Sequence, residues 1–285
     1  MVHFGLGPRK RSALRFIALA TGPAGLEGRD SPDSDISSPS FTPQYHTAVK
    51  AWHTSTEPLS EPEQAIADQL VEAYRHGAFP MADLQTGRIG FYESDRRGVF
   101  ELGAFTPRPD PARRSVVVPR TLRQRVRQQR FEITTNTAFG QVVAACAAPS
   151  RPMGWISPEL ITWYDILHRG GHAHSVEAWR HDADGARTLV GGLFGVHVNG
   201  LFAGESMFSR PELGGTDASK VCLVHLAHTL HQHGFRLLDA QLNSPHLERL
   251  GCRTIGRAAY RRRLADAMHA AARWPGPGPL PAPPL

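Results

Sequence analysis

The chain has 285 residues, 41% of them hydrophobic and 20% charged, so it can bury the core of one or two globular domains. Its formal net charge of +6 favours a polyanionic partner. No apolar run is long enough to span a membrane, which argues against a membrane partner. The three cysteines include no CxxC pair, which fits a reducing compartment and excludes a thiolate metal site. We therefore expect a cytoplasmic protein.

The two ends of the chain are predicted to be disordered. Residues 1–63 are rich in Pro, Ser, Gly and Thr and lack apolar periodicity, so we expect a disordered leader. The segment 273–285 is rich in Pro and Gly and is expected to be a disordered tail. Apolar residues at helical spacing from Ile66 to Tyr74, followed by two short strands, predict a small N-terminal α/β domain over 64–110.

A strongly basic segment follows this domain. Residues 108–130 contain eight arginines and a single acidic residue, and 119–129 should be helical. Arg120, Arg123 and Arg127 share one face of that helix and are predicted to contact the phosphates of a nucleic acid. A solvated helix face stays open as an alternative, because that is where charge runs usually lie. The codon bias of a GC-rich genome would also favour arginine.

Residues 111–272 are predicted to form a second, larger domain. Alternating and helical patterns predict a strand, two helices and then a meander of three strands over 172–208. A helix over 218–233, a strand over 237–242 and a final basic helix complete the order. The fold class is therefore α+β, with a mixed, mainly antiparallel sheet. This order is typical of acetyltransferase-like (GNAT) domains, which is an analogy at the level of the fold.

The strand over 237–242 carries the candidate catalytic residues. Asp239 and Gln241 alternate with Leu238 and Ala240, so the carboxylate and the carboxamide should leave the same face of the strand. Polar groups on a strand with apolar neighbours are expensive to bury without partners. Two interpretations remain at this point: a catalytic pair, or side chains that cap a loop or pair with arginines.

Motifs of other enzyme classes are missing from the sequence. It contains no GxSxG, HExxH, P-loop or GxGxxG motif. The glycine-rich pyrophosphate loop of coenzyme A-dependent acetyltransferases is also absent, and residues 204–208 occupy its place. His225, His228 and His231 drift around their helix without a carboxylate nearby, so we expect no metal. No cofactor is expected.

Several stretches together resemble the leucyl/phenylalanyl-tRNA–protein transferase family. The resemblance covers about 64 to 269 in the family's order. The matching stretches, specific only in combination, are 73–80, 138–142, 155–157, 171–177, 190–195, 201–208, 218–220 and 238–250.

The resemblance implies transfer of leucine or phenylalanine, or methionine, from aminoacyl-tRNA to the N-terminal Arg or Lys of acceptor proteins, which marks them for degradation. It implies a catalytic role for Asp239 and Gln241. The residues expected to bind substrate are Glu205 and Ser206 near the aminoacyl group, Trp155 on the 3′ adenine, and Phe91 and Tyr92 at the acceptor end of the tRNA. Phe91-Tyr92 stands where the family has two tryptophans, which puts that last contact in doubt. Leu193, Phe194, Met207 and Phe208 are candidates for a pocket that takes the apolar aminoacyl side chain, with ordinary core packing open as the alternative for each.

Two alternatives to this function stay open. One is a non-catalytic module that binds tRNA through the basic segment. The other is an acyltransferase of the same fold that uses another donor.

Overall fold

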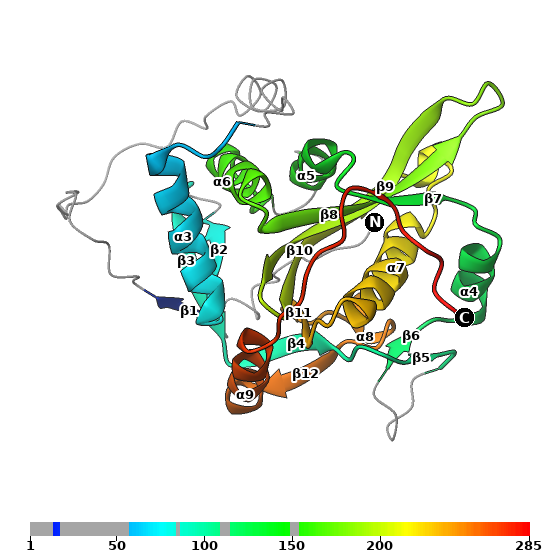
Figure 1. Cartoon of the computed structure of the whole chain (residues 1–285). Coiled ribbons are helices and arrows are strands. Elements are labelled where there is room, and N and C mark those ends of the chain that lie inside the picture. Colours follow the sequence, from blue (N-terminus) through cyan, green and yellow to red (C-terminus); the bar gives the residue numbers. More distant parts are fainter. Residues whose placement is uncertain (1–13, 18–56, 84–85, 109–114, 149–153) are drawn as a thin grey trace.

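The computed structural model describes residues 14–17, 57–83, 86–108, 115–148 and 154–285 (Figure 1). Its centre is an eight-stranded sheet in the order β12-β4-β11-β10-β9-β8-β7-β13. Neighbouring strands are antiparallel except β10 and β11, which are parallel. The mixed, mainly antiparallel sheet was predicted; the likeness to acetyltransferases stays a prediction. The strands are β4 (Arg96–Phe100), β7 (Glu132–Thr135), β8 (Ala173–His181), β9 (Arg187–Val198), β10 (Leu201–Ser209), β11 (Leu237–Gln241), β12 (Arg253–Gly256) and β13 (Gly278–Pro279).

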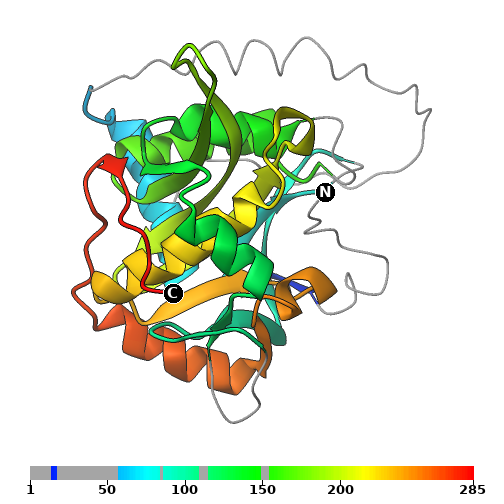
Figure 2. The same cartoon turned by 90° about the vertical axis from the view of Figure 1, so that its right-hand side faces the viewer.

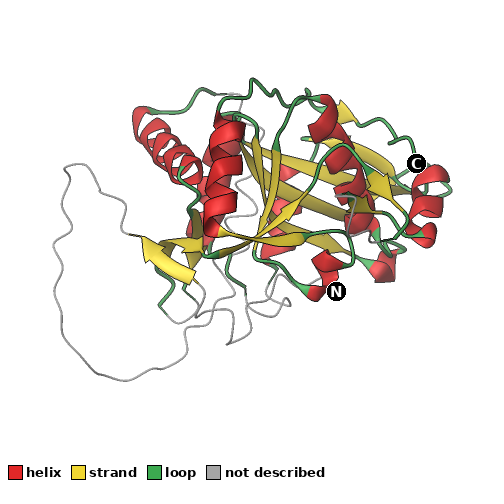
Figure 3. Ribbon diagram, turned by 90° about the horizontal axis from the view of Figure 1, so that it is seen from below, coloured by secondary structure: helices red, strands yellow, loops and turns green. Residues whose placement is uncertain are grey.

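Helices cover both faces of this sheet (Figure 3). On one face α3 (Glu61–Arg75), α5 (Phe139–Ala147), α6 (Pro158–Arg169) and α9 (Arg257–Met268) contribute to one apolar core. On the other face α4 (Arg120–Arg127), α7 (Ala218–Gln232) and the short α8 (Pro245–Glu248) contribute to a second core. Strand alternation divides neighbouring side chains between the two cores. Phe194 and Phe208 belong to the first, and Leu193 and Met207 to the second.

Local signals explain where α6 begins. Ser157 caps this helix, because its hydroxyl accepts a hydrogen bond from the backbone N–H of Leu160 at 3.2 Å. Pro158 occupies the first helical position, where a missing N–H has no consequence. The cap places Tyr164 on the buried side of the helix, facing the sheet.

The N-terminal part is joined to the large sheet rather than separate from it. A three-stranded sheet in the order β1-β3-β2 is formed by β1 (Leu14–Ile17), β2 (Phe79–Ala82) and β3 (Ile89–Ser94). The chain then enters the large sheet directly through β4, and α3 packs in the same core as α6. The domain boundary predicted near residue 110 therefore lies after β4, which already belongs to the large sheet. Two short strands, β5 (Phe105–Thr106) and β6 (Val116–Val117), and the 3-10 helix η1 (Pro211–Leu213) complete the elements.

The predictions for the chain ends need correction. The leader was predicted to extend to residue 63, but α3 begins at Glu61 and Leu14–Ile17 already pairs with β3. The other residues of the leader up to 56 lie outside the described part. The tail 273–285 is described in full, whereas disorder was expected. Composition favoured disorder, but tertiary contacts override it.

The tail crosses the second core and runs beside α7 towards α4 (Figure 2). Its β13 pairs with β7. The Trp274 ring stacks between His174 at 4.4 Å and Phe202 at 5.1 Å, centroid to centroid, and its Nε1 donates to Thr135. One large aromatic side chain therefore anchors a segment that is otherwise poor in apolar surface.

Candidate active site

The candidate site lies where the parallel strands β10 and β11 separate. Their pairing runs only from Leu201–Leu237 to Ala203–Asp239. Each strand then has an irregularity, on β10 between Gly204 and Ser206 and on β11 between Asp239 and Gln241. Bulges of this kind redirect side chains next to functional sites. Here they bring Gln241 and Glu205 together, and Gln241 Nε2 donates a 2.8 Å hydrogen bond to Glu205 Oε1.

Glu205 is a buried carboxylate held by neutral donors. It is 1% exposed and also accepts hydrogen bonds from the hydroxyls of Tyr74 at 2.8 Å and Tyr164 at 3.0 Å. Burial raises its pKa to about 7, a shift that the nearby Asp239 increases and that the two tyrosine hydrogen bonds and Arg97 oppose. Glu205 therefore titrates near neutral pH, as a group taking part in proton transfer would.

Asp239 lies in a different environment, because a cation neutralises it. Arg97 Nη2 donates to Asp239 Oδ2 at 2.7 Å, and Arg97 Nε bonds to both carboxylate oxygens at 2.9 and 3.0 Å. The Tyr260 hydroxyl donates to Oδ2 at 2.8 Å, and the backbone N–H of Gln241 donates to Oδ1 at 2.7 Å. Asp239 has no exposed surface, so its carboxylate is enclosed by protein donors.

A small apolar cavity lies against β10 and β11, on the side of the second core. It measures about 30 Å³, and its lining includes Phe194, Met207, Leu238, Leu247, Ser206 and Asp239. Phe194 and Met207, which were predicted to form a pocket for the aminoacyl side chain, are both in the lining of this cavity, and their role in binding stays a prediction. Phe208, predicted beside them, packs elsewhere, and its ring lies 5.3 Å from the guanidinium of Arg210.

The aromatic residues predicted to meet the tRNA end lie around β3 and the start of α6. Trp155 is half-buried, and its carbonyl accepts a hydrogen bond from the N–H of Ala82. Phe91 stacks on Trp163 at 6.3 Å, and Tyr92 is half-buried beside it on β3. Trp163, which sequence reasoning did not select, therefore belongs to the same aromatic group.

The predicted arginine face of α4 lies far across the sheet and is not uniform. Arg120 is exposed, and Arg123 is half-buried with its Nε lacking a hydrogen-bond partner. Arg127 is exposed, but its Nε donates to the carbonyl of Leu285 at 2.8 Å. Arg125, on another side of the helix, is paired with Asp217 at 3.2 Å.

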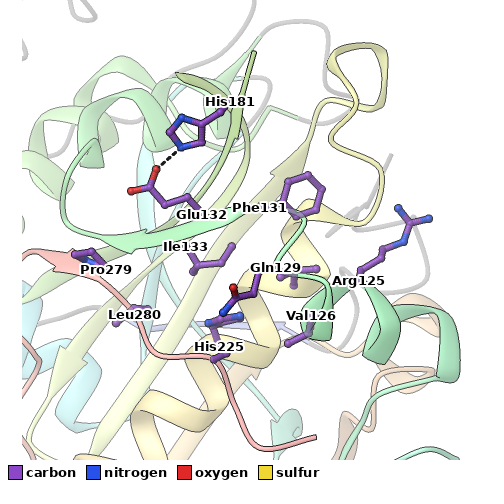
Figure 4. A pocket seen from close by; sticks show the side chains of 12 residues that line it. Arg125, Val126, Gln129, Phe131, Glu132, Ile133, His181, His225, Pro279 and Leu280 are labelled. Carbon is purple, nitrogen blue, oxygen red and sulfur yellow. Dashed lines mark hydrogen bonds and ion pairs between the residues drawn. The ribbon is translucent and has the colours of Figure 1, made fainter. Parts of the chain in front are cut away.

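A larger cavity of about 360 Å³ separates α4 from β7, α7 and the tail (Figure 4). Its rim carries the hydrogen-bonded pair His181 and Glu132, whose atoms are 2.7 Å apart. Burial lowers the pKa of His225, inside the cavity, to about 4, so this side chain is neutral at pH 7. Among the described residues no group of three or more His, Cys, Asp or Glu side chains is placed to hold a metal ion.

Comparison with known proteins assigns the chain to a family. The profile described as leucyl/phenylalanyl-tRNA protein transferase matches residues 112–265, and that of the same family's N-terminal domain matches 67–95. The chain belongs to the leucyl/phenylalanyl-tRNA–protein transferase family. A relative so named from Hyphomonas neptunium is 42% identical over 76% of this chain and 77% of its own. One from Rubrobacter xylanophilus is 46% identical over 70% of this chain and 93% of its own.

Sequence reasoning missed four residues of the site in this family member. Arg97, Tyr74, Tyr164 and Tyr260 complete the hydrogen-bond network around Asp239 and Glu205. In the sequence the three tyrosines cannot be distinguished from ordinary core residues of amphipathic helices, and Arg97 is one of many arginines. The weak signal for Arg97 was its place at the start of the strand Arg96–Phe100, just before buried Val99 and Phe100, because an arginine that is buried needs an acidic partner.

Proposed function

We propose that this chain transfers leucine or phenylalanine from aminoacyl-tRNA to the N-terminal Arg or Lys of acceptor proteins, which marks them for proteolysis. Family membership supports the reaction, since the matching relatives are named leucyl/phenylalanyl-tRNA–protein transferases. The observation that carries the assignment of the site is the contact between Gln241 and the buried Glu205. Two groups able to handle an amine meet there, and Asp239, two residues before Gln241, lines an apolar cavity.

The reaction needs alignment more than activation, because an aminoacyl ester is already reactive. The α-amine of the acceptor attacks the ester carbonyl carbon, the new C–N bond forms and the C–O bond to the ribose breaks. The proton lost by the amine passes to the departing ribose oxygen. The protein then has to place the amine against the carbonyl and stabilise its transient positive charge.

Gln241 is the group that orients the amine. Its Nε2 is engaged by Glu205, so its Oε1 is the atom that can accept a hydrogen bond from the attacking N–H. A carboxamide is too weak a base to hold a proton. The ionised Glu205 behind it supplies the negative charge, and its raised pKa places that ionisation near neutral pH.

The apolar cavity is the proposed site of the leucyl or phenylalanyl side chain. Its volume of about 30 Å³ has room for about two water molecules, so it must enlarge to admit a leucyl group. Met207 in its wall is the residue best suited to move, because methionine is unbranched and adopts many rotamers. Ser206, also in the wall, would face the aminoacyl group.

The tRNA is proposed to approach over the aromatic group of Trp155, Phe91 and Tyr92, with α4 as a second, phosphate-binding contact. No helix in the described part of the chain is long and apolar enough to cross a bilayer. Cys146, Cys222 and Cys252 are buried free thiols. Their reduced state supports the cytoplasmic location that we propose.

The proposal is tested by offering the purified chain radiolabelled leucyl-, phenylalanyl- or methionyl-tRNA together with a peptide that begins with arginine. Label should appear in the peptide, and an otherwise identical peptide with an acetylated N-terminus should stay unlabelled. Binding of tRNA without transfer from any of the three donors would contradict the proposal and identify a tRNA-binding module. Transfer from a non-tRNA aminoacyl ester alone would identify another donor.

A further inference from the structure

Arg97 and Asp239 form an ion pair in the interior of the protein. Their side chains are 1% and 0% exposed. The guanidinium lies between the rings of Phe79 at 4.8 Å and Tyr260 at 4.5 Å, and its Nη1 donates to the carbonyl of Gly77. Every part of this cation is therefore held by a specific partner.

A buried ion pair is a poor way to stabilise a fold. Removing two charges from water offsets most of their attraction, and well-packed apolar residues in the same place are often equally stabilising. The presence of the Arg97–Asp239 ion pair must then be explained by a property that an apolar pair does not have. What it provides here is a fixed, ionised hydrogen-bond acceptor, the Asp239 carboxylate, in the middle of a strand.

That acceptor is used by the backbone of Gln241. The φ angle of Gln241 is +55°, in the left-handed region that residues with a Cβ rarely adopt. Its N–H donates to Asp239 Oδ1 at 2.7 Å, the local hydrogen bond by which an aspartate stabilises a turn two residues further on. The irregular pairing of β11 with β4 begins at this step, since Asp239 lies opposite Val99 and Gln241 opposite Gly98.

The turned backbone is what directs the Gln241 side chain to Glu205. Without the turn, the strand would continue in register beside β4. We propose that Arg97 is a positioning residue for the transfer reaction, which holds the Asp239 carboxylate so that it fixes Gln241 in its left-handed conformation against Glu205. Arg97 acts through two other residues and touches no substrate atom. This inference rests on the proposed function.

The test is a double-mutant cycle between Arg97→Lys and Gln241→Ala, read by single-turnover transfer of leucine. Lysine keeps the positive charge that compensates the Asp239 carboxylate. It lacks the planar guanidinium that donates hydrogen bonds to both carboxylate oxygens. Arg96→Lys, at the exposed neighbouring position on β4, is the matched control. Rates are measured below the melting transition of each variant, so that only folded protein contributes.

Arg97→Lys should lower the transfer rate by about tenfold or more while tRNA affinity stays within about twofold of wild type. In the Gln241→Ala background the same change should lower the rate by less than about twofold, because the group it positions is gone. Arg96→Lys should transfer at the wild-type rate.

A wild-type rate for Arg97→Lys would overturn the inference, and so would an equal loss in both backgrounds, which is the mark of a purely structural role. If Arg97→Lys does not fold, the double variant Arg97→Met with Asp239→Leu takes its place in the test, because an apolar pair removes both charges. It should fold and transfer as slowly as Gln241→Ala, and near-wild-type transfer would equally overturn the inference. Absence of transfer by the wild-type chain would instead refute the proposed function.

Discussion

The backbone N–H of Gln241 donates a 2.7 Å hydrogen bond to the carboxylate of Asp239, two residues earlier on the same strand. This bond turns a regular strand into a kinked one at the position where the side chain of Gln241 meets Glu205. Asp239 and Gln241 therefore act together, but they have different roles. The Asp239 carboxylate is held by protein donors and shapes the backbone, whereas the side chain of Gln241 contacts Glu205.

We expect the pH dependence of stability to report on Glu205. Its pKa in the folded protein, about 7, lies above its ordinary value, so folding takes up a proton between about pH 4.5 and 7. The contribution of this group to stability is therefore fully present below that range and is lost as the pH rises through 7. The loss amounts to about 3 kcal/mol for a shift of this size.

Glu205→Gln removes this titration and keeps the side-chain shape. Urea unfolding of both proteins between pH 5 and 8 isolates the effect, because the histidines titrate equally in each. The wild type should lose stability relative to the variant as the pH rises. A constant difference across the range would show that Glu205 ionises normally.

Removing charge from α4 should weaken tRNA binding in proportion to lost phosphate contacts. Changing Arg120, Arg123 and Arg127 together to glutamine should reduce the slope of log affinity against log salt by about one unit or less per contact. Arg125→Gln is the matched control on the same helix, since Asp217 already neutralises Arg125. Equal slopes for the triple variant and the wild type would identify a solvated surface instead.

Trp274→Ala should destabilise the protein although it lies in a proline-rich tail. The ring is packed between His174 and Phe202, so its loss leaves a space in the second core. We expect the free energy of unfolding to fall by about 2–4 kcal/mol. The exposed neighbour changed as Arg273→Ala should be neutral in the same urea titration, and a neutral result for both would mean that the tail does not contribute to the core.

Local patterns predicted a helix from Ile66 to Tyr74, which lies within α3, and the strand with Asp239 and Gln241. The sequence did not identify side-chain partners that lie far apart along the chain. Arg97 and Asp239 are 142 residues apart in the sequence, and Tyr74 and Glu205 are 131 apart. Pairing of Asp239 with an arginine was one of the two interpretations left open, but nothing in the sequence identifies Arg97 among the arginines as its partner.

The prediction of a disordered tail was wrong for a related reason. Composition predicts whether a segment can fold by itself, but Trp274 is ordered by His174 and Phe202, far away along the chain. The alternation that placed Asp239 and Gln241 on one face also overlooked the left-handed conformation of Gln241, which depends on the Asp239 side chain as acceptor.

The most direct test of the catalytic assignment is the single-turnover rate of leucine transfer by Gln241→Ala. One positioned group of this kind contributes about 10²–10⁴-fold. We predict a rate lower by at least about 10²-fold, with tRNA affinity and melting temperature close to those of the wild type. Transfer by Gln241→Ala at a near-wild-type rate would contradict the account, because the contact between Gln241 and Glu205 would then be scaffolding.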